Sequence, residues 1–419
     1  MYRWYKILTY LFYPFANIFL LLRKLKRKED TNRYKEKLSI IKKQRGNGFL
    51  VWFHAASVGE CLSILPLVQK LEQDTKVNKI LITSVTLSSA KVLQDKLVQN
   101  KKITHQFLPL DIPKYVNQFL NHWSPNLSIF IDSEIWPNLI FQIKEKSIPL
   151  LLINGRITKK SFSRWKYFDS FSKEVFGKFD LCLASSRESE DYLKILGAKN
   201  VKNFGNLKFS STKTNISNKL NSDFLNKINN RKVWCASSTH SFEEIFCGKA
   251  HIDLKKDYQN ILTIIIPRHV NRINEIAKQL RGLNLNVILY SDVNKMNNKT
   301  DILLVDAYGE APKFFEISKS VFLGGSLIKH GGQNPIEASR LGCKILHGPN
   351  IKNFVEIYDL LKSLTISNEI NNEGDLRQSL VKGFNDNNPE NAESIKKINN
   401  YGITVLNSVM KEIKTYINI

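Results

Sequence analysis

The sequence lacks several features that would point to a function class by themselves. It has no C-x-x-C pair, so a disulfide framework or a cysteine zinc site is not indicated and a reducing compartment fits best. It has no G-x-x-x-x-G-K-[ST] run, which excludes a P-loop NTPase, and its glycine pairs come too late in the chain for the dinucleotide fingerprint. The five cysteines are scattered at Cys61, Cys182, Cys235, Cys247 and Cys343.

Acidic residues are also in short supply. The 419 residues contain 38 Asp and Glu against 62 Lys and Arg, which gives a formal net charge of +24. Such an excess indicates an anionic partner, which could be nucleic acid, an anionic membrane face or a phosphorylated substrate. The plainer alternative is a general enrichment in lysine and asparagine. The length predicts two or three domains, and 42% hydrophobic residues are enough to form buried cores.

The first thirty residues indicate attachment to a membrane. Residues 7–22 carry no charge and are followed at once by a basic cluster, residues 23–28. This run is shorter than the roughly 20 residues that span a bilayer, contains Pro14, and is followed by no small-residue cleavage site. Two interpretations stay open, a short spanning anchor or a helix lying in the interface, and both leave the rest of the chain on the cytoplasmic side. A buried first helix of a soluble domain is the third. The aromatic residues expected at headgroup level are Trp4, Tyr5, Tyr10 and Tyr13.

Beyond residue 45, short apolar runs alternate with helical patterns. Continuous apolar runs, rather than strict alternation, are typical of parallel strands buried on both faces. A polar stretch, residues 210–231, separates two such series and reads as a linker. The sequence therefore predicts two successive α/β units, with a ligand in the crevice at the carboxyl ends of their strands. The expected strands are 49–54, 79–84, 127–132, 149–154 and 180–185, then 232–236, 261–267, 286–290, 302–306, 321–325 and 344–347.

The first motif, HAASVGE (residues 54–60), closes the first expected strand and opens a helix. Ser57 and Glu60 have the spacing of a capping box, in which each side chain pairs with the other's backbone N–H. Gly59 would let a ligand approach closely, and a carboxylate at a strand end could act as a general base. The helix N-terminus would favour the ionised form of Glu60 and weaken it as a base.

Two further motifs follow strands of the first unit. In DSEIWPN (132–138), Glu134 is either a second active-site carboxylate or a favourable charge at a helix start, with Pro137 in the first turn. In NGRITKK (154–160), Arg156 after a strand suits a phosphate or carboxylate; a solvated basic loop is the alternative. The basic residues assigned to the acceptor are Arg156, Lys159, Lys160 and Arg164.

The second unit carries motifs after two successive strands. Arg268 could hold a leaving phosphate, and Ser238 or Thr239 could donate to its oxygens. His269 has two equal interpretations, a catalytic role or a packing role. These residues lie in SSTH (237–240) and PRH (267–269).

The glycine block GGSLIKHGGQNPIE (324–337) gives the sharpest prediction. Its two glycine pairs frame a helix start at which Asn334 would be the N-cap, Pro335 the first helical residue and Glu337 the capping-box partner. Glycines at a helix start expose backbone N–H groups to an anion, and a glutamate on the first turn could accept both ribose hydroxyls. The block predicts a phosphate and ribose site, formed by Gly324, Gly325, Ser326, Gly332, Asn334 and Glu337.

In this order, the motifs closely resemble those of the 3-deoxy-D-manno-octulosonic acid (Kdo) transferases of lipopolysaccharide synthesis. The resemblance extends to about residue 360 and also includes GNLKF (205–209) and GPNIKNF (348–354). It departs from the family pattern at a few loop positions. These are Asn271 where Glu is expected, Gly155 and Thr158 in place of Ala and Ser, and Ser210 where Asp is usual.

The resemblance implies an α/β fold of GT-B type, with two facing Rossmann-like domains and an N-terminal membrane-anchor helix. It implies CMP-Kdo as donor, a tetraacylated lipid A precursor as acceptor, no metal or other cofactor, and the cytoplasmic face of the inner membrane. Glu60 would deprotonate the acceptor hydroxyl, with Glu134 as a second carboxylate and Ser57 and Gly59 near the acceptor. The implied divisions are an anchor (1–28), an acceptor domain (29–209), a linker (210–231), a CMP-sugar domain (232–395) and a C-terminal helix (396–419) packing back on the acceptor domain.

Two rival classes explain part of the same evidence. A nucleic-acid-binding protein would account for the charge, but no basic surface interleaved with aromatics stands out, so no nucleic acid is expected. Another GT-B enzyme, using a UDP-sugar, would share the ribose-binding glutamate without needing an anchor. The motifs do not indicate how many Kdo units are transferred or the oligomeric state.

Overall fold

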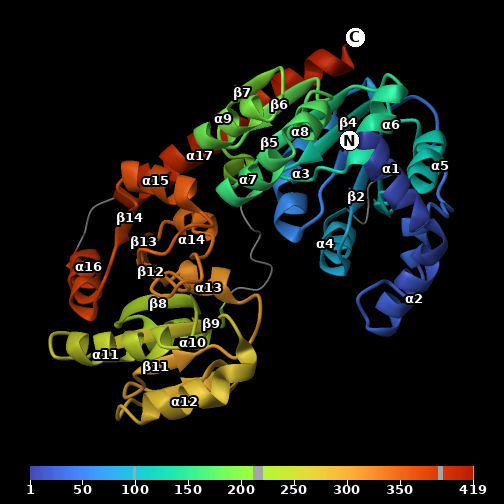
Figure 1. Ribbon diagram of the computed structural model, residues 1–419. Coiled ribbons are helices and arrows are strands. Elements are labelled where there is room, and N and C mark those ends of the chain that lie inside the picture. Colours follow the sequence, from blue (N-terminus) through green and yellow to red (C-terminus); the bar gives the residue numbers. More distant parts are fainter. Residues whose placement is uncertain (98–100, 211–219, 386–389, 419) are drawn as a thin grey trace. The chain divides into compact units, whose positions relative to one another are not determined.

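The chain folds into two compact α/β units, described here from a computed structural model. The structure describes residues 1–97, 101–210, 220–385 and 390–418. One unit comprises Met1–Thr212 together with Tyr401–Ile419, and the other comprises Lys213–Asn400 (Figure 1). The predicted α/β architecture with two parallel sheets is confirmed.

The first unit is built on a seven-stranded sheet with the strand order β3-β2-β1-β4-β5-β6-β7, in which all described neighbours are parallel. Its strands are β1 (Phe49–His54), β2 (Val77–Ser84), β3 (Ile103–Phe107), β4 (Leu127–Ile131), β5 (Leu150–Gly155), β6 (Leu181–Ala184) and β7 (Val201–Asn203). Its helices after the N-terminal segment are η2 (Tyr34–Leu38), α3 (Val58–Glu72), α4 (Leu87–Leu97), α5 (Pro113–Trp123), α6 (Pro137–Glu145), α7 (Lys159–Tyr167), α8 (Asp169–Phe176), α9 (Arg187–Ile195) and η3 (Leu207–Ser210).

The second unit repeats this plan, with the order β10-β11-β9-β8-β12-β13-β14 and parallel pairing throughout its described strands. Its strands are β8 (Lys232–Thr239), β9 (Ile261–Pro267), β10 (Val287–Leu289), β11 (Ile302–Leu304), β12 (Ser320–Leu323), β13 (Lys344–His347) and β14 (Ser367–Glu369). Its helices are α10 (Ser222–Ile228), α11 (Glu243–Lys255), η4 (Val270–Arg272), α12 (Ile273–Arg281), η5 (Tyr290–Lys295), α13 (Ala311–Phe315), α14 (Ile336–Arg340), α15 (Val355–Ser363) and α16 (Glu373–Asn385).

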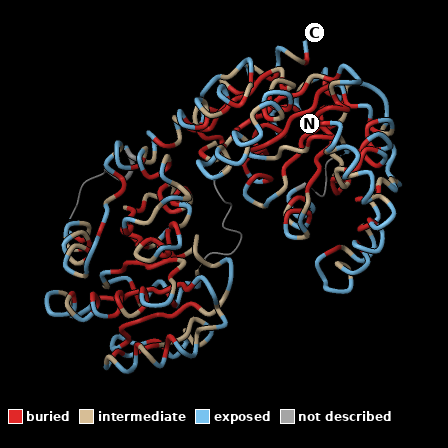
Figure 2. Tube along the Cα trace, in the orientation of Figure 1, coloured by how far each residue is buried: buried red, intermediate tan, exposed pale blue. Residues whose placement is uncertain are grey.

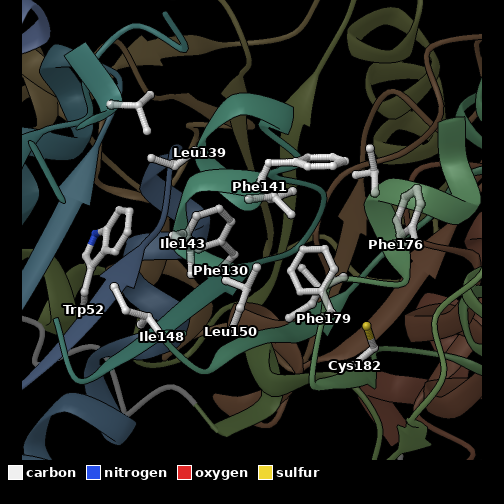
Figure 3. Close-up of a cluster of buried hydrophobic side chains, with 14 of the residues drawn as sticks. Trp52, Phe130, Leu139, Phe141, Ile143, Ile148, Leu150, Phe176, Phe179 and Cys182 are labelled. Carbon is white, nitrogen blue, oxygen red and sulfur yellow. The ribbon is translucent and has the colours of Figure 1, made fainter. Parts of the chain in front are cut away.

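Both faces of the first sheet are covered, which explains its continuous apolar strands. Along β1, Trp52 belongs to one buried cluster, which also contains residues of α5, α6, α8 and α9 (Figure 3). The next residue, Phe53, belongs to a second cluster with residues of α3 and α4. Burial therefore follows the strands of the sheet and leaves exposed residues on the outer helices (Figure 2).

Helix α17 (Glu390–Ile417) is shared between the units. From Tyr401 onward it belongs to the first unit, where Val405, Val409 and Ile413 lie in the same buried cluster as Phe53. The backbone is close enough at Gly402 that a Cβ atom would lie 2.1 Å from the Phe209 carbonyl oxygen. Helix α17 is therefore packed against Phe209, near the end of the first chain segment of this unit.

Several elements differ from those predicted from the sequence. Strands β3, β7 and β14 were not predicted. The predicted linker is wrong for residues 222–228, which form α10 and bury Phe224 and Ile228. These two apolar residues are too few to stand out in a stretch rich in Asn, Ser and Lys. The rest of the predicted linker includes residues 211–219, which lie outside the described part of the chain.

The N-terminal segment folds as α1 (Tyr2–Leu11), η1 (Tyr13–Phe15) and α2 (Ala16–Leu25). Pro14 lies in η1, where it separates the two helices as expected for a residue without a backbone N–H. By length and composition Tyr2–Leu25 could cross a membrane, with a mean hydropathy of 1.4 over its most apolar window.

One face of this segment packs along the first unit. The ring of Tyr2 stacks on Phe141 with centroids 3.6 Å apart, and the Tyr5 hydroxyl donates to Asp111 Oδ2 at 2.8 Å. Farther along, Ala16 and Leu20 are fully buried in a cluster with residues of η2 and α5. The opposite face exposes apolar side chains, namely Trp4, Ile7, Leu8, Leu11, Phe12, Phe15, Ile18, Phe19, Leu21, Leu22 and Leu25.

Candidate functional site

The predicted capping box forms in part after β1, because the Glu60 carboxylate accepts the backbone N–H of Ala56 rather than that of Ser57. Ser57 is the N-cap of α3, and its hydroxyl donates to Glu60 Oε1 at 2.6 Å and accepts from the Glu60 N–H at 3.4 Å. The other carboxylate oxygen, Oε2, accepts from the Ala56 N–H at 2.8 Å. Apart from its chain neighbours and the backbone of α3, no described protein atom lies within 4 Å of a Cβ placed on Gly59, so the space beside this helix start is open.

Glu60 is buried, with 9% of its surface exposed, and this determines its acidity. Burial raises the pKa of its carboxyl group, and the nearby carboxylates Asp132 and Glu134 raise it further. The hydrogen bonds from Ser57 and Ala56 lower the pKa but do not reverse the shift. The helix start was expected to lower the pKa of Glu60 and so to weaken it as a base. Burial has the larger effect, and the pKa is raised.

Glu134 lies beside this carboxylate, before α6. Its Oε2 accepts from Trp136 Nε1 at 2.9 Å and lies 3.2 Å from His54 Nε2. Burial alone would raise the pKa of Glu134, but the hydrogen bonds from His54 and Trp136 outweigh burial and lower it. Of the two predicted carboxylates, Glu134 therefore has a lowered pKa and stays ionised, whereas Glu60 has a raised pKa and accepts a proton more readily. The prediction that Pro137 begins the first turn of α6 is confirmed.

Sequence reasoning missed an ion pair at the same edge of the sheet. Lys208 Nζ donates to Asp132 Oδ2 at 2.8 Å, and Asn154 donates through its amide to Asp132 Oδ1. Asp132 and Asn154 follow β4 and end β5 with positive φ angles of 55° and 56°. Lys208 belongs to η3, far along the sequence. Its place in the GNLKF motif was the only available signal.

The predicted acceptor-binding basic residues occupy one stretch of surface after β5. Lys159, Lys160 and Arg164 are exposed on α7, and Arg156 is half-buried just before it. The Arg156 N–H donates to the Asp132 carbonyl at 3.2 Å, which ties this stretch to the carboxylate cluster. No residue of α7 is buried, and the exposed rings of Tyr167 and Phe168 follow the basic side chains.

In the second unit, the predicted donor-binding loops follow β8 and β9. Ser238 is half-buried with a φ of 57°, Thr239 is fully buried, and Arg268 and His269 are exposed. The Arg268 N–H donates to the Thr239 carbonyl at 2.9 Å. The two loops are thus joined by their backbones, and their side chains extend from one edge of the sheet.

The prediction that the glycine block presents free N–H groups is wrong. The Gly324 N–H donates to the Ser237 carbonyl at 2.9 Å, and the Gly332 N–H donates to the Gly325 carbonyl at 2.8 Å. The N–H groups of Gly325 and Ser326 donate to the Glu243 carboxylate at 2.7 and 3.1 Å. Donor binding by these residues stays a prediction, but it cannot use these N–H groups as arranged.

The carboxylate of Glu243 occupies the position at which the glycine block was predicted to bind a phosphate. It is fully buried and accepts four backbone N–H groups, from Gly325, Ser326, Leu327 and His240, at 2.7–3.1 Å. Burial raises the pKa of Glu243, and these four bonds counter the shift only in part. The carboxylate therefore joins the loop after β8 to the loop after β12.

Gly324 is required by this junction. A Cβ atom there would lie 2.5 Å from the Ser238 carbonyl oxygen and 2.6 Å from Thr239 Cα, which are closer than side chains tolerate. The helix that follows the block is short. It begins at Ile336, one residue later than predicted, and Asn334 Oδ1 accepts the Ile336 N–H at 3.1 Å. Glu337 is half-buried on this single turn.

Three imidazoles gather on these loops, and only His269 among them was predicted. The ring of His240 lies 4.3 Å from that of His330 and 5.9 Å from that of His269, between centroids. Burial lowers the pKa of His240 to about 4, and the neighbouring His330, His269 and Arg268 add to the effect. The imidazole of His240 is therefore neutral near pH 7, mainly because it is buried. Both missed histidines stand in motifs that were noted in the sequence, SSTH and the glycine block.

Comparison with known proteins supplies the family context for this geometry. Residues 32–211 match the family model described as 3-deoxy-D-manno-octulosonic-acid transferase (kdotransferase). The chain is 35% identical to the 3-deoxy-D-manno-octulosonic acid transferase of Rickettsia bellii, over 85% of this chain and 84% of that protein. It is 31% identical to the enzyme of the same description from Haemophilus influenzae, over 85% and 83% of the two chains.

Among solved structures, a UDP-GlcNAc 2-epimerase from Neisseria meningitidis has a similar fold. The two structures superimpose with a TM-score of 0.58, over 87% of this chain and 99% of the epimerase, at 14% sequence identity. At that identity the likeness concerns the fold alone.

We predict that Glu243→Gln destabilises the second unit. A carboxamide has one accepting oxygen, so backbone N–H groups now bonded to the second oxygen would be left buried without a partner. The free energy of unfolding should fall by about 2–3 kcal/mol, measured by denaturant unfolding of the full chain. Glu316→Gln, on an exposed glutamate of the same unit, is the matched control and should leave stability unchanged. Equal stability of the two variants would contradict the structural role assigned to Glu243.

Proposed function

The chain belongs to the 3-deoxy-D-manno-octulosonic acid transferase family, and we propose that it moves Kdo from CMP-Kdo to a hydroxyl of the tetraacylated lipid A precursor, lipid IVA. The family assignment makes it a glycosyltransferase that transfers Kdo. The acceptor, the inversion at the anomeric carbon, the independence from metal and the place in lipopolysaccharide core synthesis are parts of the proposal. The family match also favours a CMP-sugar donor over the UDP-sugar alternative.

The geometry of Glu60 supports this proposal most directly. A general base needs a pKa closer to the working pH than that of an ordinary glutamate, and a position from which it can reach the substrate. Glu60 has a raised pKa because it is buried beside two other carboxylates. Its oxygens each accept one hydrogen bond in the capping box, which leaves further lone pairs for a hydroxyl proton.

The proposed step is a single displacement. Glu60 accepts the proton of the acceptor hydroxyl, and that oxygen bonds to the anomeric carbon of Kdo. The bond between this carbon and the phosphate oxygen breaks on the opposite face, and its electron pair leaves with CMP. Inversion follows from one displacement. Glu134, already held as an anion by His54 and Trp136, would favour the positive character that the sugar ring gains in the transition state.

The leaving phosphate is assigned to side chains rather than backbone. Arg268 and His269 are exposed on the loop after β9, and His240 and His330 extend the same group. Donors aimed at the leaving oxygen stabilise the charge that develops there, so we propose that CMP leaves without a metal ion. Glu337 stays assigned to the ribose, and Ser238 and Thr239 stay assigned to the phosphate oxygens.

The acceptor phosphates are assigned to the basic stretch of α7. Lys159, Lys160 and Arg164 are exposed on this helix, and the exposed rings of Tyr167 and Phe168 follow them. Cationic side chains beside apolar ones suit a molecule with phosphate groups and acyl chains.

We assign the chain to the cytoplasmic face of the inner membrane, with the N-terminal segment lying in the interface. A spanning helix would face lipid on all sides. Here Tyr2, Ala16 and Leu20 are buried against the first unit while the opposite face is apolar and exposed. This one-sided burial supports the flat arrangement.

We predict that Glu60→Gln removes transfer while leaving the fold intact. A glutamine can take the glutamate's place in a capping box, so the helix start should hold. Loss of the base should lower kcat by about 10²–10⁴, with lipid IVA and CMP-Kdo as substrates and the product measured by mass spectrometry. Glu72→Gln, at the other end of α3, is the control and should retain activity. Near-normal transfer by Glu60→Gln would exclude Glu60 as the base.

We also predict that the acid limb of the kcat/KM profile lies above the ordinary glutamate pKa of 4.5. Below its raised pKa Glu60 carries a proton and cannot accept another, so the rate should fall as pH decreases through that value. Ser57→Ala removes a hydrogen bond that lowers the pKa, so it should move the limb to higher pH. A limb at or below 4.5, or a downward shift in Ser57→Ala, would show that another group limits the rate.

A protease-accessibility experiment separates a flat from a spanning N-terminal segment. A cleavable tag placed before Met1 should be protected in intact spheroplasts and cut only after lysis, because the flat arrangement keeps both ends on the cytoplasmic side. A tag after Ile419 serves as the internal control, and a periplasmic protein shows that the protease reaches its compartment. Cleavage of the N-terminal tag in intact spheroplasts would establish a spanning anchor instead.

A further inference from the structure

A second concentration of positive charge lies on the first unit, away from the predicted transfer residues. It surrounds a cavity of about 1020 Å³ between the end of α2, η2, α4 and the edge strand β3. Its lining shares no residue with the carboxylate cluster, which follows β1, β4 and β5. The basic groups in the lining are Lys24, Arg33, Lys35, Lys42, Lys43 and His105.

The one carboxylate in the lining is already neutralised. Glu36 accepts from Arg33 Nε at 2.9 Å and from Arg33 Nη2 at 3.0 Å, a two-pronged pair. Its Oε2 also accepts the Phe107 N–H at 2.8 Å, which covers the edge of β3. Arg33 and Glu36 therefore act mainly on each other and on the sheet, and they contribute little net charge to the cavity.

His105 contributes no positive charge to the cavity, because its imidazole is neutral. Burial lowers its pKa to about 3, and the nearby charges of Arg33 and Lys43 add to the effect. Arg33 can only donate, so Nδ1 of the ring, 3.0 Å away, accepts and the proton sits on Nε2, 2.9 Å from the Ser84 hydroxyl. The imidazole is held neutral mainly by its burial, and the charges of Arg33 and Lys43 act in the same direction.

Four lysines remain without a carboxylate partner among the described residues. Lys35 and Lys42 are exposed at the rim, and Lys43 Nζ donates to the His105 carbonyl oxygen. Lys24, on α2, lies over the ring of Tyr34 at 4.9 Å. Scattered surface lysines would need no explanation, but four that converge on one hollow leave a charge that a bound anion would neutralise.

The position of Lys24 indicates what kind of anion. It lies in the last turn of α2, next to Leu22 and Leu25, whose side chains are 54% and 79% exposed. A phosphate in the cavity would thus have an apolar surface beside it. Phosphate and apolar chains together are the chemistry of a membrane lipid, and basic residues beside an interfacial helix favour an anionic headgroup.

We propose that this cavity binds the phosphodiester headgroup of an anionic phospholipid, one molecule per chain, at a site separate from that of transfer. The cavity and its charge stand on the described residues alone, whereas the choice of a lipid over a free phosphate rests on the proposed membrane attachment. A bound lipid would fix the end of α2 to the first unit and hold the enzyme at a defined depth in the interface.

Calorimetry on the full-length protein in non-ionic detergent tests this proposal. Dihexanoylphosphatidylglycerol, titrated as a monomeric lipid, should bind at one site, and dihexanoylphosphatidylcholine should not. The double variant K35A/K42A should weaken phosphatidylglycerol binding at least tenfold. K26A/K28A removes the same charge from exposed positions outside the lining and should change binding less than twofold.

Three outcomes would overturn the proposal. Absence of phosphatidylglycerol binding would exclude the site, and equal weakening in both double variants would reduce it to general surface charge. Binding of inorganic phosphate as tight as that of the lipid would identify a free-phosphate site instead. Transfer of Kdo to detergent-solubilised acceptor by K35A/K42A should equal that of the parent chain, so failure of this inference and failure of the proposed function are distinguishable.

Discussion

In each unit, one buried glutamate holds the loops that carry the predicted binding residues. Each lies at the start of the first helix after a central strand, Glu60 after β1 and Glu243 after β8, and each accepts backbone N–H groups of the loop before it. They differ in how far each carboxylate is left free to accept a proton or contact a substrate. Glu243 is fully buried and has four N–H donors across its two oxygens, so it acts on the protein alone. Glu60 has only two donors, some exposed surface and open space beside Gly59, which suits a group that must also meet a substrate.

Local signals predicted most of the fold and the position of these loops, because parallel strands buried on both faces are continuous apolar runs and capping boxes have a fixed spacing. Strands β7 and β14 were missed because they have only three residues and are mostly polar, and β3 was missed because Thr104, His105 and Gln106 interrupt its apolar run. In the site, the sequence placed Glu60 and Glu134 correctly at strand ends, but no spacing rule could pair Asp132 with Lys208, which lies 76 residues away. The glycine block was misread for the same reason, since the carboxylate that fills it comes from a different strand–helix junction.

In the N-terminal segment, tertiary contacts favour one of the interpretations that composition leaves open. Its apolar run suits either a spanning or an interfacial helix, and hydropathy alone does not separate them. The Tyr5 hydroxyl of this segment donates to Asp111, and the Asn138 amide of α6 donates to the Thr9 hydroxyl of this segment. A helix surrounded by lipid could not make these polar contacts with the first unit. Together with the break at Pro14, they support one face for protein and one for lipid.

The net charge of +24 suits the anions that the proposals assign to this chain. Anions are expected at three places: the leaving phosphate near the histidine loops, the acceptor phosphates at α7, and the lipid headgroup at the cavity beside α2. After β1 and β4 the first unit instead concentrates Glu60, Asp132 and Glu134, where burial raises the pKa of Glu60 and the other two carboxylates raise it further. The raised pKa of Glu60 depends on burial first and on like charges nearby second, and the basic groups of the cavity do not oppose it because they lie beside the edge strand β3 rather than after β1 and β4.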